Sequence, residues 1–183
     1  MNVRRIVAGT DEAGRSVILS DGPAPNSHDF AALPGQSQTR IWYSPGPATT
    51  TAPTDEPTSP KGPMLPGPGG ASFVVVGFAP DSVATAPDFD PDRAGAEFAE
   101  WVPDFAAASD PGEPGMHRTD TVDFGVVLAG EIWLETADGA QTRLAPGDTV
   151  VQVAGRHAWR NKSDRPATVA FVLTGAVEAT AEA

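Results

Sequence analysis

Two histidines and one aspartate are the residues of this chain whose types and spacing are best suited to chemistry. His117 and Asp123 occur in the segment MHRTDTVDFGVVLAGE, and His157 lies in the segment GDTVVQVAGRHAWRN. Two imidazoles and one carboxylate form a ligand set that holds a divalent metal ion and leaves coordination positions open for a substrate or for oxygen. We therefore predict a metal site made of His117, Asp123 and His157.

Glycine and asparagine residues complete two short motifs around these three side chains. Gly130 follows Asp123, while Gly147 and Asn161 flank His157. The two motifs resemble those of the cupin superfamily, whose members are small β-barrels with a metal ion in the mouth of the barrel. The resemblance implies an all-β fold, namely an antiparallel cupin β-barrel (a double-stranded β-helix, or jelly roll). It also implies a divalent metal ion, which could be Fe, Mn, Zn or Ni.

The chain departs from the family pattern at four places. Asp123 takes the place of the usual glutamate, the interval from Gly147 to His157 is one residue short, and two other motif residues are replaced. Thr119 stands where the first motif usually has its second histidine, and Val153 replaces a proline of the second motif. The threonine reduces the implied ligand set from four residues to three. Two interpretations of Thr119 stay open, because its hydroxyl can bond a metal-bound water or a substrate oxygen, and because a β-branched residue also suits a strand.

The alternation of side chains along an extended segment predicts further pocket residues. Thr119 shares a face with His117, and Trp159 shares a face with His157. We expect Thr119 and Trp159 to line the same pocket, with Gln152 as a third candidate. Trp159 can also be an ordinary core residue, which is the commoner role of a tryptophan in a strand.

Short strands separated by turn residues dominate the C-terminal half of the chain. Residues 122–129 are rich in β-formers, and residues 131–135 alternate between apolar and polar faces. The Asp138-Gly139 pair is a hairpin signal between two such runs. This pattern predicts an antiparallel barrel or sandwich.

The N-terminal half is predicted to extend this barrel. Residues 1–112 contain four β-type runs, a proline-rich loop and a short helix, residues 113–175 form the barrel core, and residues 176–183 are a tail. Residues 44–70 include eight prolines and few large apolar side chains, which predicts a mobile surface loop.

A short helix is predicted from Pro91 to Trp101, with Asp90 as its N-cap. Phe98, Trp101 and Phe105 have nearly helical spacing, so we expect them to pack onto the barrel. His28 lies in the polar segment PNSHDF and is interpreted as a surface histidine in a loop.

Composition excludes several classes of function. The absence of cysteine excludes disulfides, thiol catalysis and thiolate metal sites. The net charge of −12 argues against nucleic-acid binding, because an acidic chain repels phosphates. Without a long apolar run, neither a signal peptide nor a membrane span is expected, so a cytoplasmic location is the prediction.

Two classes of function remain. The first is a metal-dependent enzyme that acts on a small organic metabolite, and the resemblance implies oxygenase, decarboxylase, isomerase or cyclase chemistry. The alternative is a non-catalytic cupin that binds or senses a small molecule. Because barrels of this kind expose sheet faces and edges, we also expect a homodimer, with Trp133 among the residues that cover such surfaces.

Overall fold

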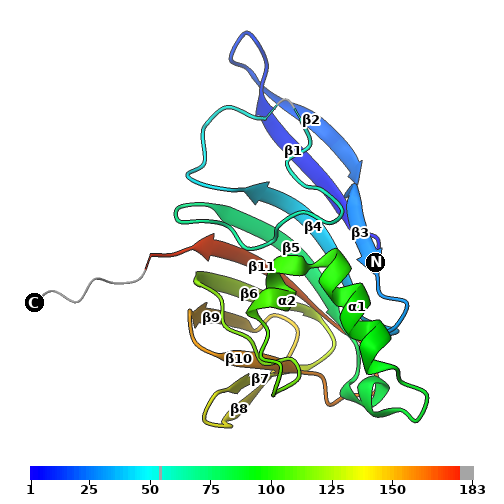
Figure 1. The fold of residues 1–183 in the computed structure, drawn as a ribbon. Helices are drawn as coiled ribbons and strands as arrows, with labels where there is room; N and C mark the ends of the chain where they lie inside the picture. Colours follow the sequence, from blue (N-terminus) through cyan, green and yellow to red (C-terminus); the bar gives the residue numbers. More distant parts are fainter. Residues whose placement is uncertain (54, 178–183) are drawn as a thin grey trace, which may run out of the picture.

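The computed structural model describes residues 1–53 and 55–177 and consists mainly of antiparallel β-sheet (Figure 1). Its strands are β1 (Arg4–Thr10), β2 (Ser16–Pro23), β3 (Asn26–Asp29), β4 (Ser37–Ser44), β5 (Ala71–Phe78), β6 (Thr121–Ala129), β7 (Ile132–Thr136), β8 (Gln141–Leu144), β9 (Thr149–Val153), β10 (His157–Arg160) and β11 (Ala167–Gly175). Its helices are η1 (Asp81–Thr85), α1 (Pro91–Trp101) and α2 (Pro103–Ala108). The predicted antiparallel β fold is confirmed.

Two sheets enclose the main core. A six-stranded sheet has the order β3-β4-β5-β11-β6-β9, and a three-stranded sheet has the order β10-β7-β8. Val74, Val169 and Leu173 from the larger sheet pack in one buried cluster with Ile132 and Leu144 from the smaller sheet. Alternate residues of each strand point into this core, as the period of two in the sequence predicts.

The N-terminal strands join the sheet of the C-terminal half. β5 pairs with β11 over its whole length, and β11 pairs on its other side with β6. The N-terminal part is therefore an extension of the barrel sheets. The hairpin of β1 and β2 forms a separate two-stranded sheet that projects from one end of the molecule (Figure 1).

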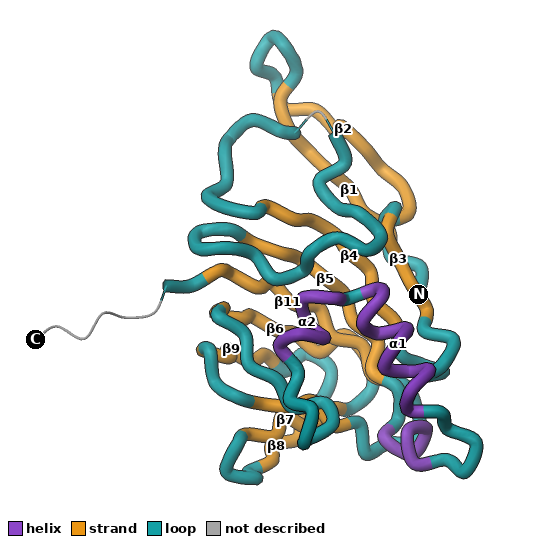
Figure 2. The backbone as a smooth tube through the Cα atoms, viewed as in Figure 1, coloured by secondary structure: helices purple, strands orange, loops and turns teal. Residues whose placement is uncertain are grey.

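Helix α1 begins as the sequence predicts. The side chain of Asp90 accepts a hydrogen bond from the backbone N–H of Arg93, and Pro91 occupies the first turn. Phe98, Trp101 and Phe105 pack against the main core, which confirms their predicted role. Figure 2 shows that the helices gather on one side of the sheets. None of the described helices is long and apolar enough to span a membrane.

The prediction that His28 is a surface residue in a loop is wrong. His28 lies in β3, where it pairs with Gln38 of β4. Its ring stacks on Trp101 with centroids 3.7 Å apart, and its Nε2 lies 3.0 Å from Glu97 Oε1. The local sequence is short and polar, so the segment becomes a strand only by pairing with β4, and the side chains of α1 then cover His28.

The prediction of a mobile surface loop is also wrong for the later part of residues 44–70. Met64 is buried in the main core, with 4% of its surface exposed. The backbone N–H groups of Met64 and Leu65 both donate to Asp104 Oδ2, each at 2.6 Å. A single buried methionine and a carboxylate from α2 therefore anchor a segment whose composition is typical of disorder.

Arg40, a buried arginine, also attaches this segment, and its removal should destabilise the fold. The Arg40 guanidinium donates to the carbonyls of Gly62, Pro63 and Trp101, at 3.0 Å for Pro63 and 2.7 Å for Trp101. Arg40→Met should lower the free energy of unfolding by about 2–4 kcal/mol, because three partly buried carbonyls lose a charged donor. Urea denaturation measures this loss, and Arg93→Met on exposed α1 is the control. A loss below about 1 kcal/mol would show that water satisfies these carbonyls.

Candidate functional site

The two predicted histidine ligands lie side by side. The backbone N–H of His117 donates to the His157 carbonyl at 2.9 Å, and the N–H of His157 donates back to the His117 carbonyl at 3.0 Å. The two ring centroids are 4.3 Å apart. His117 lies just before β6 of the larger sheet and His157 begins β10, an edge strand of the smaller sheet, so the pair links the two sheets.

Each imidazole is held in one orientation by the backbone two residues before it. His117 Nδ1 lies 3.0 Å from the Gly115 carbonyl, and His157 Nδ1 lies 2.8 Å from the Gly155 carbonyl. A carbonyl only accepts, so each Nδ1 carries the hydrogen in the neutral ring and Nε2 keeps a lone pair. Such second-sphere hydrogen bonds commonly orient histidines that ligate metals.

The surroundings keep both rings neutral. Burial lowers the pKa of His157 to about 4, and the neighbouring His117 adds to this effect. Burial also lowers the pKa of His117. Because a metal ion binds only the unprotonated imidazole, the pair is in its binding form at neutral pH without any proton loss.

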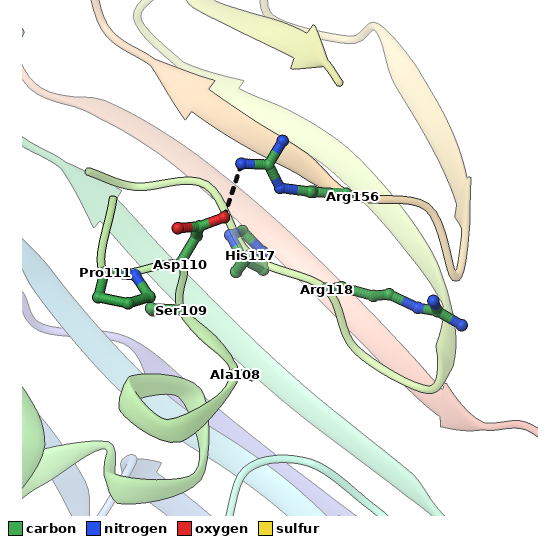
Figure 3. Close-up of a pocket in the computed structure, with 7 residues that line it drawn as sticks. All are labelled: Ala108, Ser109, Asp110, Pro111, His117, Arg118 and Arg156. Atoms are coloured by element: carbon green, nitrogen blue, oxygen red, sulfur yellow. Dashed lines mark hydrogen bonds and ion pairs between the residues drawn. The ribbon is translucent and has the colours of Figure 1, made fainter. Parts of the chain in front are cut away.

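Two arginines of the β10 segment fix the loop that carries His117. Arg156 forms an ion pair with Asp110 at 2.7 Å (Figure 3). It forms a second ion pair with Glu113 at 3.0 Å. Arg160 donates to the Pro114 carbonyl at 2.7 Å. The loop that precedes His117 is thus tied to the strand that carries His157, which places the two imidazoles together. Sequence reasoning missed these arginines, since only their charge opposite the loop carboxylates could have indicated the role.

An open cavity of about 250 Å³ lies beside the histidine pair. Its lining residues are Ala108, Ser109, Asp110, Pro111, His117, Arg118 and Arg156 (Figure 3). His117 is the predicted site residue that reaches this cavity. The cavity gives a small molecule access to one edge of the histidine pair.

Asp123 does not join the histidines. It is buried within β6, where it pairs with Gln152 of β9, and 8% of its surface is exposed. Within residues 1–53 and 55–177, no group of three or more histidine, aspartate or glutamate side chains is close enough to hold one metal ion. Among these residues, His117, Asp123 and His157 therefore do not form one three-residue ligand set.

The environment of Asp123 is unusual for a carboxylate. Its Oδ1 is buried and has no hydrogen-bond partner among the described residues. Burial raises the pKa of Asp123 to about 6, against a smaller opposite effect of a hydrogen bond from Thr121. A carboxyl group in this state carries a proton far more readily than an ordinary aspartate.

None of the three predicted pocket residues lines the cavity beside His117. Thr119 is buried, and its hydroxyl lies 2.8 Å from that of Thr121. The Trp159 ring lies 6.1 Å from the His157 ring and packs on Phe171 in the main core. This placement favours the core interpretation of Trp159.

Gln152 supports the site indirectly. Its Nε2 donates to the Gly155 carbonyl at 3.2 Å, which is the same carbonyl that orients His157. Gln152 also pairs with Asp123 across β9 and β6. Gln152 therefore lies opposite Asp123 in the sheet, while its side chain bonds the backbone that orients His157.

Asn161 and Gly130, which belong to the sequence motifs, have structural roles. The Asn161 side-chain amide donates to the carbonyls of Phe78 and Arg165, at 2.9 and 2.8 Å. Gly130 has φ of 73°, and a Cβ there would lie 2.8 Å from backbone atoms of residues 166 and 167. Both residues stabilise the connections around the barrel and do not touch the histidines.

A metal ion fits this site in part. The two imidazoles, with Nδ1 occupied and Nε2 free, have the chemistry of two metal ligands. Asp123 does not supply a third in this conformation. The structure thus supports a two-histidine site and not the three-residue set that the spacing suggested.

Comparison with known protein families identifies the family to which the C-terminal part of the chain is related. Residues 107–177 match the family model described as "Cupin domain". This segment forms a cupin domain. It contains the whole histidine pair and all strands from β6 to β11.

Known relatives of the cupin domain include fungal proteins. Oryzines biosynthesis cluster protein J of Aspergillus oryzae is 52% identical over 51 residues, which span 28% of this chain and 28% of that protein. Cupin-domain-containing oxidoreductase srdB of Neurospora crassa is 26% identical over 172 residues, which span 92% of this chain and 71% of that protein. A solved structure of a Cupin 2 conserved barrel domain protein from Salinispora arenicola aligns with a TM-score of 0.39 and 17% identity, over 79% of this chain and 80% of that one.

Proposed function

We propose that this chain is a metal-dependent cupin enzyme that acts on a small organic metabolite beside the histidine pair. The observation that carries the proposal is the pair itself, because a buried imidazole and a half-buried one, both neutral, lie side by side and each has a fixed tautomer. A structural histidine needs no neighbour of its own kind, and burying two adjacent imidazoles is costly unless a ligand uses them.

Each residue of the proposed site has a separate task. His117 and His157 would hold the ion through Nε2, and a divalent ion bound there would act as a Lewis acid toward an oxygen of the substrate. The cavity beside His117 would receive the substrate. The loop fixed by Arg156 keeps His117 in place during binding, and the buried wall formed by Trp159 limits access of water from the core side.

The relatives support small organic metabolites as the class of substrate. One relative is named as an oxidoreductase, and another is named for a biosynthesis cluster. The cluster relative matches over 51 residues only, so its name bears on that short segment alone. Among the implied reactions, an oxidation is therefore the one that we favour, with Fe, Mn, Zn or Ni as the candidate metals.

A non-catalytic cupin that binds a small molecule is the alternative function. It is favoured by the lack of a third acidic or histidine ligand near the pair in the described part of the chain. With two protein ligands only, an ion would be held weakly, and the cavity could serve binding alone.

Metal content tests the proposed function directly. Protein that is purified without added metal, and analysed for its elements, should contain about one divalent ion per chain or take up one on titration. His28→Gln is the matched control, since this histidine lies in β3 and contacts α1, and it should not change uptake. Protein that takes up no Fe, Mn, Ni or Zn, yet binds small molecules in a ligand screen, would leave the binding cupin as the function.

A further inference from the structure

Nearly all cationic side chains of this chain already have a partner. The chain contains 12 lysines and arginines, and within residues 1–53 and 55–177 only Arg93 and Arg118 form neither an ion pair nor a side-chain hydrogen bond. Arg93 lies on α1, whereas Arg118 lines the cavity beside His117. Arg118 is therefore an unused positive charge at the edge of the proposed site.

The backbone of Arg118 is fixed, and its side chain is left to reach a ligand. Its N–H donates to the Ala108 carbonyl at 3.3 Å, which holds this residue against the end of α2. The residue is exposed, and Figure 3 shows Asp110 and Arg118 on opposite sides of His117. The guanidinium thus presents five N–H donors beside the cavity, on the side away from the acidic loop.

Arg156 adds further donors to the wall of the same cavity. Both of its ion pairs, with Asp110 and with Glu113, are formed by the single nitrogen Nη2. Its Nε and Nη1 have no acceptor among the residues that the structure describes. Asp110 is the acidic residue of the cavity lining, and it is engaged by Arg156, so Arg118 has no acidic counterpart there.

The net charge of the whole chain makes this local positive charge significant. At −12, the protein repels anions over most of its surface. An anion is held most easily where arginines outnumber carboxylates, and the cavity lining has two arginines against one aspartate. The planar fork of a guanidinium matches a carboxylate, with which it forms two parallel charge-assisted hydrogen bonds.

We propose that the cavity binds a small organic acid, whose carboxylate pairs with Arg118 while the rest of the molecule lies against His117. One unpartnered arginine balances one negative charge, which favours a monocarboxylate over a phosphate dianion beside Asp110 and Glu113. The volume of about 250 Å³ is below the usual range of drug-sized pockets, so the acid is small. The inference rests on the proposed function for the turnover of this acid, whereas its binding needs only the cavity.

Matched pairs of acids and amides test whether the cavity requires a negative charge. Acetate and benzoate are titrated into the metal-free full chain in the presence of a chelator, against acetamide and benzamide, and NMR shifts report binding. At least one acid should bind about 10-fold more tightly than its amide, since the amide has nearly the same shape without the charge.

A variant of Arg118 assigns this preference to its guanidinium. Arg118→Gln should weaken binding of the preferred acid by about 10-fold or more and leave binding of the amide unchanged. Arg93→Gln is the matched control, because it removes the other unpartnered arginine from α1 and should change neither affinity. The inference is overturned if neither acid is preferred to its amide, or if Arg118→Gln binds the acid as tightly as the parent. Inorganic phosphate that binds as tightly as the acid would overturn the choice of a carboxylate.

The outcome for the acid can be separated from the outcome for the metal. Uptake of a divalent ion and binding of the acid are measured on separate samples of the same protein. Acid binding through Arg118 in protein that takes up no ion would leave this inference intact and contradict the metal-dependent enzyme. Uptake of an ion by protein that shows no preference for acids would have the opposite meaning.

Discussion

Replacing His157 with alanine should lower the affinity for a divalent metal ion by about 100-fold or more, and should leave the sheets folded. The variant removes one of two imidazole ligands, whereas changes in the residues that merely orient such ligands already cost 10–100-fold. The core rests on apolar strands, so circular dichroism should be unchanged at room temperature. Calorimetric titration of the metal-free protein with the divalent ion measures the affinity of each variant for the ion.

Two further variants make this result specific. Thr119→Ala should bind the ion as well as the parent protein does, because the hydroxyl is already bonded to Thr121 and is at best a weak ligand. His117→Ala should lose affinity to the same extent as His157→Ala, since the two rings hold equivalent places. If His157→Ala binds metal as tightly as the parent, the histidine pair is not the metal site and the proposed enzyme loses its chemical basis.

Replacing Asp123 with asparagine should stabilise the metal-free protein at pH 7.5 by about 2–3 kcal/mol. The buried carboxyl group has a folded-state pKa of about 6 against an ordinary value of 3.8. The folded state therefore holds its proton more tightly than the unfolded state. This contribution to stability is complete below pH 4 and is lost as the pH rises to about 6. Asparagine retains the shape without the cost of the buried charge.

His157 has the opposite pH dependence, so the two effects compensate in the parent protein. Its pKa falls from 6.5 to about 4 on folding, which means that the unfolded state takes up the proton first as the pH decreases. Stability from the neutral imidazole is complete above pH 6.5 and is lost between pH 6.5 and 4. Asp123→Asn should therefore show a steeper loss of stability in acid than the parent protein.

Urea denaturation at several pH values between 4 and 8, in the presence of a chelator, measures both effects. Asp164→Asn is the control, because its side chain is 90% exposed and its neutralisation should change stability little at any pH. If Asp123→Asn is less stable than the parent at pH 7.5, the carboxylate is compensated in the folded state and its pKa is not raised by burial.

Most elements of the fold could be predicted because their signals are local. The alternation in residues 122–129, the Asp138-Gly139 turn and the Asp90-Pro91 helix start all act through a few neighbouring residues. Helix α2 was missed, although Pro103 begins it, because six residues are too few to show a period. His28 was misplaced because its strand depends on pairing with β4 and on stacking against Trp101.

The sequence by itself determined that the fold is mainly β-sheet, where the cupin domain lies, and which two histidines lie side by side. Only the tertiary structure decided that Asp123 stays apart from them, that the proline-rich segment is anchored by Met64, and that Arg118 lines the cavity beside His117. The physical reason is the separation along the chain of the residues that interact. Periodicity, caps and turns depend on contacts between near neighbours, whereas the distance between two side chains depends on register across strands that are remote in sequence. One residue's shift in that register moves a carboxylate to a different face, and spacing along the chain does not record it.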